Sequence, residues 1–174
     1  MGLSIPNRLG RKQGRFSSDY EVNEINAGLR GHQQAFGDEV DYYRFLREDS
    51  EMDDIYDEAA GVGRIYNGPI PIPALRVVHL EGSITNVDTG LYWNDELHLT
   101  LSFDQMGKVG LTKMDIEHQQ YLRDRIVYDE RVFTVTNVQI LGQVQRRDVV
   151  VSIDATQVKG DELVNDPQWK RWSD

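Results

Sequence analysis

Apolar and polar residues alternate most strictly between positions 96 and 103. Apolar side chains take every second position, as Leu97, Leu99, Leu101 and Phe103. Polar side chains take the positions between, as Glu96, His98, Thr100 and Ser102. Because successive side chains of a strand point to opposite faces, this pattern predicts an antiparallel strand with one buried and one solvated face.

Residues 124–154 carry three successive runs of β-branched and aromatic residues, at 126–128, 132–138 and 149–153. The acidic pair Asp129–Glu130 separates the first two runs, and a looser connection at Gly142 precedes the third. Such residues fit a pleated, half-buried surface, whereas Asp and Glu favour the break between runs. The stretch predicts a hairpin and a return strand, the unit of small antiparallel barrels and sandwiches.

Further strands are expected upstream. The alternate prolines of Gly68–Pro73 impose an extended backbone and exclude a central strand, so this segment is an edge or a connector. A strand follows at 75–80 and ends or bulges at Glu81–Gly82. A short strand is expected at 84–87, with turns at 88–90 and at Asn94–Asp95.

The first sixty residues predict short helices. Ser18 to Glu21 has the spacing of a capping box, and Gly28 and Gly31 limit the following helix to about three turns. Asp38 is placed to cap a second helix, with Val40, Tyr43 and Leu46 on one face, and Ser50 begins a third. Residues 38–58 carry ten carboxylates. Adjacent helical positions diverge, so we interpret these acids as a solvated helix face rather than as metal ligands or catalysts.

Residues 104–123 interrupt the sheet with a long insertion. Thr112 to Asp115 predicts a capped helix that runs to Leu122. His118 lies close to Asp115 and Glu117, so a metal site or an acid–base pair is the alternative to a solvated helix face.

These segments predict a mainly β (α+β) fold, a small antiparallel β-barrel or sandwich with short N-terminal helices and an interstrand helical insertion. We expect an extended basic arm and short helix at 1–37 and an acidic helical segment at 38–62. The barrel spans 63–160, including the 104–123 insertion, and an aromatic tail follows at 161–174.

Both ends of the chain are candidate partner contacts. The basic residues of the first segment are Arg8, Arg11, Lys12 and Arg15. This arm is either a disordered terminus or a segment that orders on an acidic neighbour. In the tail, Trp169, Arg171 and Trp172 either cover the barrel or anchor to a partner, because Trp and Arg are enriched at interface hot spots.

Composition narrows the function. The net charge of −10 opposes sequence-independent DNA binding, which needs a basic face. The chain has no cysteine, which excludes thiol chemistry and disulfides, and no apolar run long enough to span a bilayer. Nucleophile-elbow, P-loop, dinucleotide and His-x-x-x-His motifs are absent, and the four histidines are scattered singly. We therefore expect no enzymatic activity, no cofactor, no metal and no membrane contact.

Four segments resemble the head-to-tail stopper, or head-closure, proteins of tailed phages with actinobacterial hosts. They are SEMDDIYDEAAG at 50–61, GPIPIPALRV at 68–77, DRIVYDERVFTV at 124–135 and TQVKGDELVNDPQ at 156–168. With the strands between them they cover most of residues 38–168, whereas the first 37 residues match no segment of the family. These motifs are structural rather than catalytic.

The resemblance implies a structural protein of the virion neck, made in the host cytoplasm. Family members form a ring, usually six-fold, beneath the portal and adaptor rings. This ring closes the DNA channel and offers a platform to the tail terminator or tail tube. The implied partners are further copies of the chain, these neighbouring rings, and packaged DNA held by containment rather than by tight binding.

The family closes the channel with a projecting loop, and two stretches are candidates here, 84–94 and 104–123. We favour the second for its length and glycines. Its candidate plug residues are Gly107, Lys108, Gly110, Lys113, Asp115 and His118. Deleting 107–118 is then expected to give particles that assemble but leak DNA. The alternatives are another neck component, an adaptor or a tail-completion protein, or a cellular β-barrel binding module.

Overall fold

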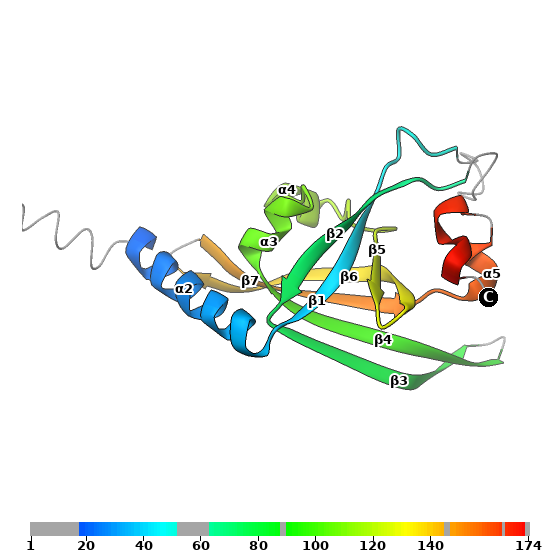
Figure 1. Ribbon diagram of the computed structural model, residues 1–174, viewed down its shortest axis with the longest axis horizontal. Helices are drawn as coiled ribbons and strands as arrows, with labels where there is room; N and C mark the ends of the chain where they lie inside the picture. Colours follow the sequence, from blue (N-terminus) through cyan, green and yellow to red (C-terminus); the bar gives the residue numbers. More distant parts are fainter. Residues whose placement is uncertain (1–17, 52–62, 88–89, 145–146, 165, 173–174) are drawn as a thin grey trace, which may run out of the picture.

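The computed structural model describes residues 18–51, 63–87, 90–144, 147–164 and 166–172. Seven strands form one antiparallel sheet in the order β2-β1-β5-β6-β7-β4-β3 (Figure 1). The strands are β1 (Asp38–Phe45), β2 (Tyr66–Ala74), β3 (Arg76–Val87), β4 (Gly90–Ser102), β5 (Arg125–Tyr128), β6 (Arg131–Val144) and β7 (Arg147–Gln157). The helices are α2 (Ser18–Phe36), α3 (Phe103–Lys108), α4 (Lys113–Glu117), α5 (Gly160–Leu163) and the 3-10 helix η1 (Pro167–Trp172). The predicted mainly β class is confirmed.

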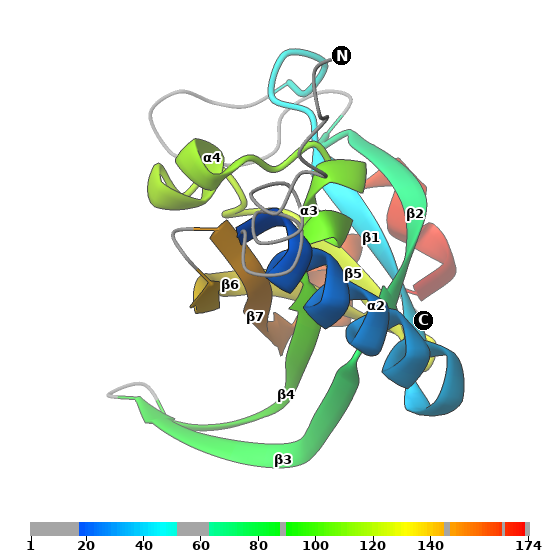
Figure 2. The same cartoon turned by 90° about the vertical axis from the view of Figure 1, so that its left-hand side faces the viewer.

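The predicted closure into a barrel is wrong. The two edge strands, β2 and β3, follow each other in the chain and are separated by Leu75 alone, whose N–H donates to the carbonyl oxygen of Thr100 at 2.8 Å. From this corner they diverge, β2 to pair with β1 and β3 to pair with β4 (Figure 2). No ladder joins β2 to β3 among the described residues, so the sheet is strongly curved but open.

The helix predicted from Asp38 is a strand. β1 pairs antiparallel with β2 on one side and with β5 on the other. Its alternate residues Val40 and Tyr42 are buried in the core, so the period-2 pattern prevails over the helical spacing of Val40, Tyr43 and Leu46. Hence the sheet already begins inside the segment predicted as helical, 38–62. The rest of that segment, 52–62, lies outside the described residues.

The first helix is longer than expected. α2 has 19 residues and continues through Gly28 and Gly31, where an added Cβ would meet no atom within 4 Å. It packs along β6 and β7 through Val22, and most of its surface faces solvent (Figure 1). The helix ends at Phe36, and the next residue is Gly37, where a Cβ would lie 2.6 Å from the Ala74 carbonyl oxygen. Among the described residues, no helix is both long enough and apolar enough to cross a membrane.

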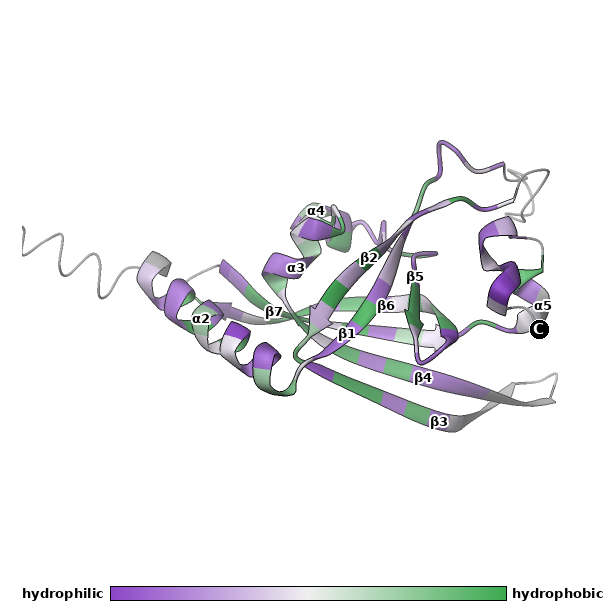
Figure 3. Ribbon diagram, viewed as in Figure 1, coloured by the Kyte–Doolittle hydropathy of each residue, from purple (hydrophilic) through white to green (hydrophobic). Residues whose placement is uncertain are grey.

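The main core lies inside the curve of the sheet. Along β1, β2 and β4, hydrophobic and hydrophilic positions alternate, as Figure 3 shows. Leu97, Leu99 and Leu101 are at most 1% exposed, which confirms the predicted strand. The insertion after β4 completes this core with Met106, Val109, Leu111, Ile116 and Tyr121.

The strands predicted within 124–154 are confirmed as β5, β6 and β7, with Asp129–Glu130 as the first turn. β6 is longer than expected and continues past Gly142, where its register with β7 shifts. The turn predicted at Asn94–Asp95 is wrong, because both residues belong to β4, where Asn94 pairs with Ser83 of β3. The Glu81–Gly82 bulge is confirmed by a register shift between Leu80 and Ser83.

Candidate assembly surfaces

The outer half of the β3–β4 hairpin projects beyond the sheet (Figure 1). β3 and β4 pair from Arg76–Thr100 to Val87–Gly90, whereas β4 pairs with β7 only from Glu96 to Ser102. In the part of the chain that the structure describes, residues 83–87 and 90–94 therefore form a ribbon with no third strand. A two-stranded ribbon alone is marginally stable in water. This projecting ribbon contains the first of the two stretches predicted to close a channel.

Asp95 fixes the base of the projecting ribbon. Its Oδ1 accepts a 2.9 Å hydrogen bond from the N–H of Gly82, whose φ is +70° at the bulge. Its Oδ2 lies 3.1 Å from His79 Nε2 and also binds the Arg131 guanidinium. The Gly82 N–H, followed by His79 and Arg131, lowers the pKa of Asp95 below its usual value. A charged Asp95 thus ties both hairpin strands to β6.

Aromatic contacts hold the same base against the sheet. The His79 ring packs edge-on to Phe133, with centroids 5.7 Å apart, and to Tyr128 at 6.4 Å. The Tyr128 hydroxyl donates to Asp38 Oδ2 at 2.7 Å, and this bond raises the pKa of Tyr128 to about 12. The foot of the hairpin is therefore rigid where the ribbon leaves the sheet.

The favoured candidate, the 104–123 insertion, is part of the core. Val109, Leu111 and Ile116 are each at most 7% exposed, and Lys113 Nζ lies 3.4 Å from Asp148 Oδ2 on β7. Most of the predicted plug residues occupy its solvent side, as Gly107, Lys108, Gly110, Lys113 and His118. Asp115 instead completes the predicted capping box with Thr112. The helix ends at Glu117 rather than at Leu122.

The C-terminal segment covers the outer face of the sheet. Trp169 is fully buried and packs against Tyr43 and Tyr66, with ring centroids 4.6 and 5.3 Å away. This matches the alternative in which the tail covers the sheet. Trp172 is partly buried beside Trp169, and the exposed Arg171 lies over the Trp172 ring at 5.6 Å. Partner contact through Arg171 and Trp172 stays a prediction.

A buried ion pair fastens this segment. Arg125 Nη1 lies 2.8 Å from Asp166 Oδ2, and both side chains are at most 2% exposed. The guanidinium sits between the rings of Tyr66, at 4.9 Å, and Trp169, at 5.2 Å. Removing either charge would leave the other buried and unpaired, which typically costs about 3–5 kcal/mol. Burial raises the pKa of Tyr66 to about 12.

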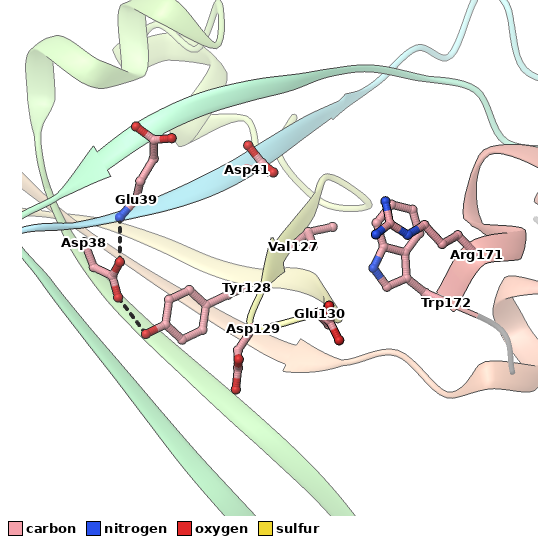
Figure 4. A pocket seen from close by; sticks show the side chains of 9 residues that line it. All are labelled: Asp38, Glu39, Asp41, Val127, Tyr128, Asp129, Glu130, Arg171 and Trp172. Atoms are coloured by element: carbon pink, nitrogen blue, oxygen red, sulfur yellow. Dashed lines mark hydrogen bonds between the residues drawn. The ribbon is translucent and has the colours of Figure 1, made fainter.

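An acidic groove of about 650 Å³ lies between β1, the β5–β6 turn and η1 (Figure 4). Its carboxylates are Asp38, Glu39, Asp41, Asp129 and Glu130. Arg171 and Trp172 line its opposite side. Three of the acids predicted to lie on a helix, Asp38, Glu39 and Asp41, thus line a groove beside a strand.

A second groove, of about 680 Å³, is cationic. Its lining residues are Arg44, Phe45, Arg47, His118, Gln119, Gln120, Leu122 and Arg123. None of them is acidic. Sequence reasoning missed this cationic groove because Arg44 and Gln120, which are joined by a 2.9 Å hydrogen bond, lie 76 positions apart.

Buried Asp124 holds one wall of the cationic groove in place. It accepts hydrogen bonds from the Tyr42 hydroxyl at 2.7 Å, Arg44 Nη1 at 2.6 Å and the N–H of Phe45 at 2.8 Å. Burial raises the pKa of Asp124, and Arg44 opposes that shift. Arg123 lies over the Phe45 ring at 5.6 Å. The end of β1 is therefore locked against the segment that precedes β5.

The remaining predictions concern the basic arm, the acidic pairs of 52–58 and a possible metal site. Arg8, Arg11, Lys12 and Arg15 lie outside the described residues, as do Asp53, Asp54, Asp57 and Glu58. Within the described ranges, no group of three or more His, Asp or Glu residues could hold a metal ion. Asp115 and His118 therefore form no such cluster with Glu117.

The chain was compared with family models, curated proteins and solved structures. No family model and no curated protein matches the chain. Among solved structures, the chain is similar to a chain of the "Virion of native gene transfer agent (GTA) particle". The two share 11% sequence identity and a TM-score of 0.42, and the alignment covers 70% of this chain and 94% of that chain.

Proposed function

We propose that this chain is a structural protein of a phage neck, which forms a ring below the portal and adaptor, closes the DNA channel and presents a platform to the tail. The resemblance of the four segments within 50–168 to head-closure proteins supports this role. In this proposal its partners are its own copies and the adjoining rings, and DNA is contained rather than bound. The net charge of −10 suits a channel lining that repels a polyanion.

The observation that carries the proposal is the projecting ribbon. Within the described residues, 83–87 and 90–94 have no strand partner besides each other, yet Asp95, His79 and Arg131 hold their base firmly. An element of this kind can extend from a rigid subunit and gain further contacts when several copies assemble. We therefore assign channel closure to the 84–94 stretch, and not to the insertion favoured by sequence length.

The test is to shorten the projecting ribbon. Residues 84–93 are replaced by Asn-Gly, which suits a two-residue hairpin turn between Ser83 and Asn94. We expect particles that assemble with normal amounts of the chain but lose their packaged DNA. The measurement is the fraction of particles that hold nuclease-resistant DNA after purification.

Lys108→Ala combined with Glu117→Ala is the matched control, because both side chains are exposed on the competing insertion and lie outside the cationic groove. These particles should retain DNA normally. Normal retention by the shortened chain, or leakage by the control alone, would contradict the assignment of the ribbon. Absence of the chain from isolated necks would contradict the neck role itself.

A further inference from the structure

The cationic groove and the β5–β6 turn lie at opposite ends of the same strand. His118 to Arg123 precede β5 and line the groove, and Asp129–Glu130 directly follow β5 as a two-residue turn. Arg44 in the groove is paired with Asp124, and Arg47 and Arg123 also line that surface. In a chain of net charge −10, a groove lined by no acid is a distinct feature.

The acidic turn, Asp129–Glu130, is exposed at the surface. Asp129 and Glu130 have φ angles of +48° and +60°, values that such a turn normally gives to Asn or Gly. Both side chains are exposed, and neither forms an ion pair with another described residue. A strained Asp–Glu turn therefore keeps two carboxylates at a tip where glycine would relieve the backbone.

One chain cannot bring these two surfaces together. Asp129 lies six positions after Arg123, and a strand rises about 3.3 Å per residue, so the two ends are roughly 20 Å apart. That span exceeds the reach of facing Arg and Asp side chains. Two copies in a head-to-tail arrangement can satisfy both surfaces at once.

We infer that the Asp129–Glu130 turn of one copy docks in the cationic groove of a second copy. The contact is heterologous, because it joins two different surfaces, and heterologous contacts close into rings when the rotation between copies permits. Leu122, which is 44% exposed at the groove, adds apolar area beside the charges. The ring that this contact would build is part of the proposed function, and the inference rests on that proposal.

Sedimentation of the full chain, at increasing concentration and in low salt, tests the contact. We expect self-association that weakens as salt screens the charges. A groove variant, Arg47→Gln with Arg123→Gln, and a turn variant, Asp129→Asn with Glu130→Gln, should each weaken association roughly tenfold or more. Asn is well tolerated at positive φ, so the turn variant keeps the fold.

Mixing the two variants gives the sharper result. The groove variant keeps an intact turn and the turn variant keeps an intact groove, so a 1:1 mixture should form heterodimers that cannot extend. The charge-matched control, Arg76→Gln with Lys108→Gln, changes exposed cations outside both surfaces and should associate like the unmodified chain. A monomer at all concentrations, unchanged association in both variants, or a mixture without heterodimers would overturn the inference.

The outcomes separate this contact from the neck role. If the variants associate normally, the turn-to-groove contact fails while the hairpin assay still reports on DNA retention. If the chain is missing from isolated necks, the neck role fails while a measured contact between copies stands.

Discussion

The insertion at 104–123 and the projecting β3–β4 ribbon contain the two stretches predicted to close a channel, and their packing is opposite. The insertion places Met106, Leu111 and Ile116 in the main core. On β4 the ribbon precedes Glu96, where pairing with β7 begins, and among the described residues its two strands pair only with each other. From its length and glycine content, the insertion was the stronger candidate for a projecting loop. Its buried side chains instead make it part of the main core.

The largest expected difference concerns global stability. Leu111→Ala removes a side chain that is 2% exposed in the insertion and leaves a cavity in the main core. The free energy of unfolding should fall by about 2–5 kcal/mol, measured by chemical denaturation. Met114→Ala in the same insertion is the control, because Met114 is 65% exposed and should change stability by less than about 0.5 kcal/mol. Equal effects of the two variants would mean that the insertion is not a core element.

The next effect is local to the ribbon. Asp95→Asn removes the charge that Gly82, His79 and Arg131 share, so amide hydrogens of the ribbon should exchange roughly tenfold faster while the core strands change little. Glu81→Gln is the control, since the Glu81 side chain is 72% exposed and its 3.7 Å ion pair with Arg131 is therefore screened by solvent. Uniform acceleration across the whole sheet would show that the ribbon does not open separately.

This local effect also has a pH dependence. The folded protein lowers the pKa of Asp95, so its contribution is complete above the ordinary pKa of an aspartate and is lost as pH falls through the lowered value. Ribbon amides should therefore lose protection in acid in the unmodified chain but not further in Asp95→Asn.

The smallest expected effect is at the helix cap of the insertion. Thr112→Ala removes the hydroxyl that accepts from the Asp115 N–H, at a cost of about 1 kcal/mol in unfolding free energy, whereas Thr112→Ser should restore it. The Thr112 hydroxyl and N–H also donate to Asp115 Oδ2 and lower the pKa of Asp115, so these two bonds should weaken as pH falls through that lowered value. A Thr112→Ala chain with unchanged ribbon exchange would sharpen the separation of the two regions.

The strands that could be predicted from the sequence are those whose own residues show a strand pattern. The alternation at 97–101 and the runs within 124–154 are short-range features. The prolines of β2 also indicate an edge strand locally, because proline has no N–H to donate to a neighbouring strand. β1 was predicted as a helix because its acids and the spacing of Val40 and Tyr43 suit one. Its strand conformation depends on partners in β2 and β5 that lie far along the chain.

The assembly surfaces were harder to predict because they join distant residues. Asp95 meets His79 and Arg131 only after two hairpins have formed, and Asp124 meets Arg44 across 80 positions. The aromatic tail was recognised as unusual, but its burial depends on the Arg125–Asp166 pair, which no local motif reveals. Paired charges that are separated along the chain leave no periodic signal in the sequence.

The corner at Leu75 has a mechanical consequence. β3 continues through this single residue into β2 at the opposite edge of the sheet, and Leu75 is held by Thr100 on β4. A load on the hairpin tip along the strand direction would pass through covalent backbone to the far edge. It would also act in shear on the antiparallel ladder between β4 and β7, where the hydrogen bonds from Glu96 to Ser102 share the force. The open sheet thus resists a push along its projecting ribbon better than its lack of closure suggests.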